Sequence, residues 1–155
     1  MNGRRVRKLS VEKRLLCSIR RRHGVVILRS DFSRFGSASQ VSRALAKLVA
    51  AGVLIRVGHG LYAKTRVNSF TGRSTPASPF ESIAAEAFRR LGIVVGPGKL
   101  AREYNSGQST QIPMQPIVST GKRRISRRIE VGSKKVIYER APNRTAKGRS
   151  CPELE

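Results

Sequence analysis

The sequence predicts an α+β protein with an N-terminal winged helix-turn-helix followed by a small α/β C-terminal domain. Residues 30–64 read in order as a brief helix, a turn, a longer helix and a glycine-centred hairpin. Apolar residues of the longer helix recur with helical spacing. Basic residues outnumber acidic ones by 32 to 9 in 155 residues, for a formal net charge of +23. This excess favours a polyanionic partner, with nucleic acid ahead of membrane.

The first predicted helix begins after Ser10, which can cap it, and ends at Gly24. Residues 25–28 form a short apolar run, which we expect to be a strand that pairs with the later hairpin. Residues 1–9 are predicted to be a flexible basic arm that follows a DNA minor groove or only aids solubility. Its cations are Arg4, Arg5, Arg7 and Lys8.

Ser30 is expected to cap the brief helix, which runs to Phe35 and stops at Gly36. The longer helix begins near residue 37 or 39 and ends at Gly52. Its apolar stripe leaves a polar face, which we predict to be the recognition surface for DNA. The polar candidates on this helix are Ser37, Ser39, Gln40, Arg43 and Lys47.

Gln40, Arg43 and Lys47 lie at positions i, i+3 and i+7 and therefore share a helix face. Glutamine can pair with adenine and arginine with guanine in the major groove, each through two hydrogen bonds. The small Ser37 and Ser39 allow the helix N-terminus to approach a phosphate closely. The plainer alternative is a solvated helix face with no ligand.

Residues 53–57 and 61–64 are predicted to be two strands joined at Gly58-His59-Gly60. This hairpin would be the wing, which usually touches the minor groove or the DNA backbone. Its candidate contacts are Arg56, His59 and Lys64. His59 either donates to a phosphate or is merely solvated.

The winged domain is assigned to residues 10–65, and residues 66–79, rich in Ser, Thr, Gly and Pro, are predicted to be a linker. Residues 80–141 would form the small C-terminal domain, with a helix from residue 80 and strands over 116–120, 124–131 and 135–140. Residues 142–155 have the composition of a disordered tail.

A second concentration of basic residues lies on the predicted C-terminal hairpin. It is either another nucleic-acid surface or a docking face for an acidic protein. Its members are Lys122, Arg123, Arg124, Arg127 and Arg128.

Enzymatic and metal-binding signatures are weak. The two cysteines, Cys17 and Cys151, form no metal-ligand cluster, and Asp31 is the only aspartate. Metal-dependent nucleases need clustered carboxylates, which the spacing does not provide. We therefore expect no catalysis, no cofactor and no metal. Because no apolar run reaches the roughly 20 residues that span a bilayer, we expect a soluble cytoplasmic protein.

The chain resembles AbiEi-like antitoxins of bacterial type IV toxin–antitoxin systems. The resemblance lies in SQVSRALAKLVAAGVLIRVGHGLYAK (residues 39–64) and in residues 79–141, which include the segment Ser109-Thr110-Gln111-Ile112-Pro113. It implies a winged domain that binds inverted repeats in its own promoter and represses transcription. It also implies a C-terminal part that opposes a co-encoded nucleotidyltransferase-like toxin. The family's DNA-binding role falls here on Gln40, Arg43 and Lys47.

The function we expect is therefore sequence-specific binding of double-stranded DNA by an autoregulating repressor that acts as an AbiEi-like antitoxin. The alternative is a module that binds protein or RNA through the basic C-terminal hairpin, without sequence-specific DNA readout. A weaker option, suggested by charge alone, is nonspecific packaging of nucleic acid.

Overall fold

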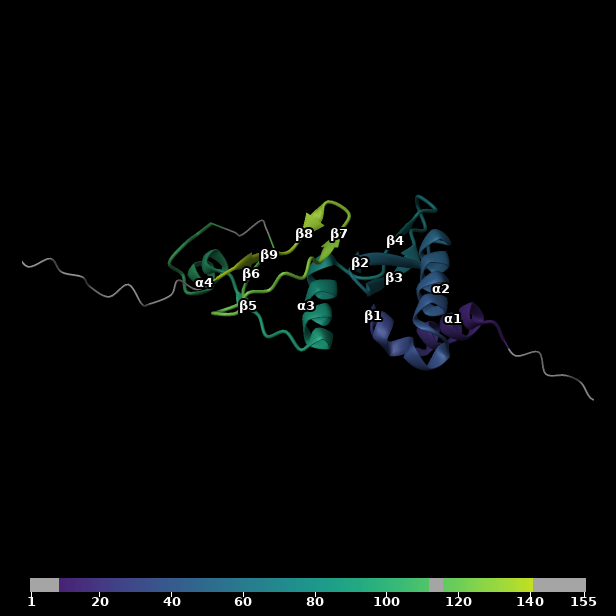
Figure 1. The fold of residues 1–155 in the computed structure, drawn as a ribbon. Helices are drawn as coiled ribbons and strands as arrows, with labels where there is room; N and C mark the ends of the chain where they lie inside the picture. The colour runs from purple at the N-terminus through teal and green to yellow at the C-terminus, as the bar shows by residue number, and fades with distance from the viewer. Residues whose placement is uncertain (1–8, 112–115, 141–155) are drawn as a thin grey trace, which may run out of the picture. The chain divides into compact units, whose positions relative to one another are not determined.

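The computed structural model describes residues 9–111 and 116–140 and is a mixed α+β fold with five helices in this part of the chain (Figure 1). The chain divides into two compact units. The first comprises residues 1–93 and 127–136, and the second comprises residues 94–126 and 137–155. The predicted arm cations at residues 4–8 and the tail predicted from residue 142 lie outside the described residues.

Three helices of the first unit pack around one apolar core. They are α1 (Val11–Arg21), the 3₁₀ helix η1 (Arg29–Phe35) and α2 (Ala38–Ala50). The predicted cap of α1 is confirmed, since the Ser10 hydroxyl accepts a hydrogen bond from the Lys13 amide at 3.3 Å. The core contains Leu15, Phe32 and Leu45, all with no exposed surface. Helices α1 and α2 contact each other across it.

The sheet of the first unit has the strand order β1–β3–β2, with antiparallel pairing throughout. Its strands are β1 (Val26–Leu28), β2 (Leu54–Gly58) and β3 (Leu61–Val67). Strand β1 pairs with β3 from Val26 opposite Ala63 to Leu28 opposite Leu61. The predicted pairing of this short strand with the hairpin is thus confirmed. Gly60 has a φ of 65°, a left-handed conformation that glycine adopts without strain in the β2–β3 turn.

The segment predicted to be a linker contains a strand. Strand β4 (Ser74–Pro76) pairs antiparallel with the far end of β3, from Thr65 to Val67. Between them, the Asn68 side chain accepts hydrogen bonds from the Phe70 and Thr71 amides. The Ser, Thr, Gly and Pro content of residues 66–79 therefore reflects a hairpin turn and an edge strand rather than an unpaired connection.

Helix α3 (Phe80–Leu91) belongs to the first unit, whereas the predicted domain boundary placed it in the second. Its Glu86 carboxylate accepts hydrogen bonds from the Val25 and Val26 amides at 3.1 and 3.2 Å. Its Arg90 guanidinium donates to the Val26 carbonyl at 2.6 Å. Two side chains one helical turn apart therefore satisfy the free edge of β1, which would otherwise present unpaired backbone groups.

Asp31 joins four elements of the first unit. Its Oδ2 accepts hydrogen bonds from Arg22 Nη1 at 2.9 Å, from Arg90 Nη2 at 2.7 Å and from the Leu28 amide at 3.2 Å. These contacts connect the end of α1, the end of β1, the start of η1 and α3. Asp31, and not the predicted Ser30, is thus the side chain that bonds the backbone at the start of η1.

The chain returns to the first unit with a small hairpin, β7 (Glu130–Val131) and β8 (Lys134–Lys135). Ile129 and Val136 flank this hairpin and are 0% and 4% exposed. The Val136 amide donates to the Ile129 carbonyl at 3.0 Å, which closes the base of the hairpin. Burial of these two side chains anchors the hairpin.

The second unit contains β5 (Gly96–Pro97), α4 (Lys99–Asn105), β6 (Ile117–Ser119) and β9 (Ile137–Glu139). Strand β6 pairs antiparallel with β5 and parallel with β9. The Glu139 carboxylate accepts a hydrogen bond from the Lys99 amide at 2.6 Å. The prediction of a strand over residues 124–131 is wrong for residues 124–129, which form neither helix nor strand. The chain passes from the second unit to the first within this stretch.

We expect Asp31→Asn to lower the free energy of unfolding by about 3 kcal/mol, because two partly buried guanidiniums lose their counter-charge. Urea denaturation of the full chain measures this loss. The control is Lys134→Gln, which breaks the exposed Lys134–Glu81 pair (3.3 Å) and should cost less than about 1 kcal/mol. If both variants lost the same free energy of unfolding, Asp31 would contribute no more to stability than an exposed ion pair.

Candidate nucleic-acid interface

Helix α2 separates its buried and exposed residues cleanly. Val41, Leu45 and Leu48 are at most 3% exposed and face the core. By helical geometry, the line opposite this stripe carries Ser39, Arg43 and Ala46, all of which are exposed. Among the described residues, Arg43 has no ion pair or hydrogen bond to another side chain. Arg43 is therefore an exposed charged group of α2 without a side-chain partner among the described residues.

Gln40 is exposed but turned back toward the start of its own helix. Its Oε1 accepts a hydrogen bond from the Ser37 amide at 3.0 Å, and the Ser37 hydroxyl accepts one from the Gln40 amide at 3.3 Å. This reciprocal arrangement is a capping box. Two-bond pairing with adenine needs both the oxygen and the nitrogen of the glutamine amide. In this conformation the Gln40 oxygen already accepts one hydrogen bond, so pairing with adenine would use its second lone pair. The role predicted for Gln40 stays a prediction.

Lys47 lies on the flank of α2 that borders the start of α1. Its ammonium is 3.6 Å from a Glu12 carboxylate oxygen, in a pair whose side chains are 70% and 43% exposed. A shallow groove of about 250 Å³ lies between α2 and the start of α1, and Gln40, Arg43 and Lys47 all line it. Such an exposed pair is weak and can be replaced by a phosphate contact. Lys47 suits a backbone contact better than base readout.

Arg29, at the start of η1, was missed by the sequence analysis. Its guanidinium donates to the Ser42 hydroxyl on α2 at 3.4 Å, and its amide donates to the Gly60 carbonyl in the β2–β3 turn at 2.9 Å. It therefore connects the exposed side of α2 with the hairpin turn. The sequence did contain one indication of this role. Arg29 directly follows residues 25–28, which were expected to form a strand paired with the hairpin.

Two of the three predicted hairpin residues, Arg56 and His59, are exposed. The third, Lys64, points inward and donates to the Arg22 carbonyl at the end of α1. Burial lowers the pKa of the Lys64 ammonium, the Glu86 carboxylate opposes this shift, and the Arg22 guanidinium adds to it. Because β3 passes the C-terminal end of α1, Lys64 reaches the carbonyl of the residue that caps this helix. We exclude it from the candidate interface.

The second basic concentration is divided between the two units. Lys122, Arg123 and Arg124 belong to the second unit, whereas Arg127 and Arg128 belong to the first. All five are exposed. Arg127 Nη1 donates to the His59 carbonyl at 3.4 Å, which places this arginine at the β2–β3 turn. The structure therefore brings two of the five beside the predicted hairpin contacts.

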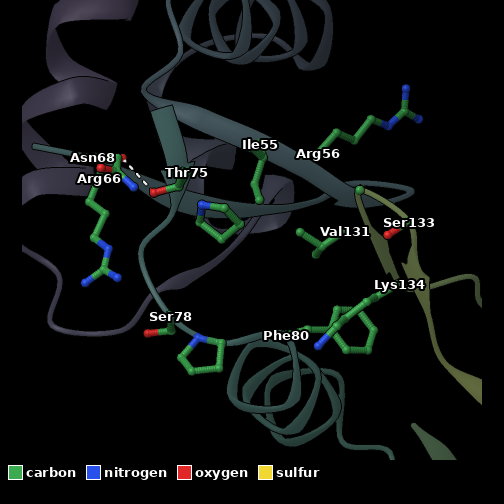
Figure 2. A pocket seen from close by; sticks show the side chains of 13 residues that line it. Ile55, Arg56, Arg66, Asn68, Thr75, Ser78, Phe80, Val131, Ser133 and Lys134 are labelled. Carbon is green, nitrogen blue, oxygen red and sulfur yellow. Dashed lines mark hydrogen bonds between the residues drawn. The ribbon is translucent and has the colours of Figure 1, made fainter. Parts of the chain in front are cut away.

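The first unit also has an open groove of about 720 Å³ between its sheet, the start of α3 and the β7–β8 hairpin (Figure 2). Ile55, Phe80 and Val131 approach the same space from three different elements. Lys134 lines the groove and pairs with Glu81, whose pKa is lowered by its own backbone amide and by this lysine. With apolar walls and a basic rim, the groove is suited to an anionic group attached to an apolar body.

Among the described residues, no three His, Cys, Asp or Glu side chains gather as a metal site would require. No helix in that part of the chain is long and apolar enough to cross a membrane. The predicted lack of enzymatic activity stays a prediction.

Residues 14–151 match a protein family of unknown function, DUF6088. The chain belongs to this family. The match includes α2, the β2–β3 hairpin and residues 127–136, so the candidate interface lies within the region that defines the family. No curated protein matches the chain.

We expect the wild-type protein to gain stability relative to Lys64→Met as the pH rises toward the ordinary lysine pKa of 10.5. The pKa of Lys64 is lower in the folded chain than its ordinary value of 10.5, so the folded state disfavours the charged form. This penalty is complete below the folded-state pKa and is lost as the pH rises from that pKa to 10.5, where the unfolded chain also loses the proton. Urea denaturation across this range measures the difference. The exposed Lys13→Met is the control, and an identical trend in both variants would contradict the inward placement of Lys64.

Proposed function

We propose that the protein binds double-stranded DNA in a sequence-specific manner, with α2 in the major groove. The observation that carries this proposal is the outward line of α2, where Arg43 stands exposed between the small residues Ser39 and Ala46. Small neighbours allow the helix to approach base edges closely, and an unpaired guanidinium can bond the O6 and N7 atoms of guanine together. Arg43 is the proposed base-reading residue.

The order α1, β1, η1, α2, β2, β3 supports a winged helix-turn-helix, with η1 and α2 as the two helices and the β2–β3 hairpin as the wing. In such a domain the helix reads bases and the wing holds the backbone. Arg29, Lys47 and His59 would make phosphate contacts in this arrangement. These residues lie on separate elements that the first unit holds together.

The regulatory role follows from the resemblance to AbiEi-like antitoxins. We propose that the protein represses its own promoter by binding inverted repeats there, in the cytoplasm. A co-encoded nucleotidyltransferase-like toxin would be its second partner. The apolar and basic groove beside α3 is a candidate contact surface for an acidic segment of that toxin.

Binding to DNA from upstream of the protein's own gene tests the proposal directly. With six to ten phosphate contacts, affinity should fall about 10³- to 10⁵-fold between about 50 and 200 mM salt. The protein should bind the DNA from upstream of its own gene more tightly than random DNA at every salt concentration. Equal affinity for both would favour the alternative of a module that binds protein or RNA, or nonspecific packaging.

Arg43→Ala should weaken binding to the upstream site by about 1–3 kcal/mol and leave binding to random DNA nearly unchanged. Lys47→Ala should instead weaken both by a similar factor, since a phosphate contact carries no sequence information. Fluorescence anisotropy with the two DNAs measures this difference. Arg89→Ala, an exposed arginine on α3, is the charge-matched control. If Arg43→Ala weakened both DNAs equally, its readout role would be rejected.

A further inference from the structure

We infer that the β2–β3 turn and residues 127–128 form one composite site for a nucleic-acid phosphate. The site lies at the point where the returning chain meets the hairpin. Its hydrogen-bond donors are Arg56, His59, Arg127 and Arg128, which come from two stretches of sequence about 70 residues apart. This inference rests on the proposed function, which it extends beyond the helix and the hairpin.

Backbone contact fixes the two stretches against each other. Gly58 has no side chain, and a Cβ at this position would lie 2.5 Å from the Arg128 carbonyl oxygen. Arg127 adds a hydrogen bond to the His59 carbonyl at 3.4 Å. Ile129, which directly follows, is fully buried. Close packing at Gly58 and burial of Ile129 thus hold both arginines beside the turn.

The contact leaves a cleft of about 530 Å³ between the two stretches. Arg56 and His59 line it from the turn, and Arg128 and Glu130 line it from the returning chain. No carboxylate of the described residues lies within salt-bridge distance of the Arg56 or Arg128 guanidinium. A guanidinium presents paired N–H donors that match the oxygens of a phosphate. Glu130 repels an anion, so a phosphate would sit on the side of the cleft formed by Arg56, His59 and Arg128.

This cleft connects with the exposed side of α2. The Arg29 amide bonds Gly60, which adjoins His59, and the Arg29 side chain reaches Ser42 on α2. Basic groups therefore follow one another from α2 through Arg29 and the turn to Arg128. A DNA backbone that meets the first of these groups can continue to the last.

The salt dependence of DNA binding tests this inference, because each lost phosphate contact reduces the slope of log affinity against log salt by about 0.9. Arg128→Gln should reduce the slope by about this amount on upstream and random DNA alike. The matched control is Lys122→Gln, an equal charge change in the same basic stretch but in the second unit. Its slope should equal that of the wild type.

Gly58→Ala gives a second test that changes no charge. Its methyl group requires residues 127–128 to move, so the slope should fall as it does in Arg128→Gln. Circular dichroism and thermal denaturation verify that the variant is folded. If the folded Arg128→Gln and Gly58→Ala variants kept the wild-type slope of log affinity against log salt, the composite site would be overturned. Equal decreases of this slope in Arg128→Gln and Lys122→Gln would also overturn it. Absence of DNA binding by the wild type would instead overturn the proposed function itself.

Discussion

The carboxylate of Asp31 is the interaction on which the first unit depends. It accepts hydrogen bonds from Arg22 and Arg90 at 2.9 and 2.7 Å, and it also bonds the Leu28 amide. In a chain of net charge +23, two guanidiniums beside one another would repel without this group. Asp31 therefore fixes the end of α1 and the start of η1 against α3. Glu86 and Arg90 then hold the edge of β1, and β1 in turn aligns the β2–β3 hairpin with the start of η1.

This framework explains why the proposed interface contains few acidic groups. Three acidic residues, Asp31, Glu86 and Glu81, bind partners that join α3 to the rest of the first unit. Each holds α3 to a neighbouring element. Basic side chains on α2, on the hairpin turn and at residues 127–128 are exposed. The same charge balance that stabilises the unit thus leaves a positive surface on the side of the turn and α2.

Local signals predicted α1, η1, α2 and the β2–β3 hairpin, because caps, glycines and apolar spacing within each segment determine these elements. Three features were beyond such signals. The inward turn of Lys64 depends on side-chain conformation. The docking of α3 and the position of Arg127 depend on contacts between residues at least 60 apart in sequence, such as Glu86 with Val26 and Arg127 with His59. Periodicity carries no information about these contacts.

We propose that the outward line of α2 meets base pairs, and NMR titration of the ¹⁵N-labelled full chain with a duplex from upstream of its gene measures this. The largest chemical-shift changes should fall on the amides of Ser39, Arg43 and Ala46, with smaller changes at His59 and none along α4. Changes confined to the second unit, with α2 unaffected, would contradict it.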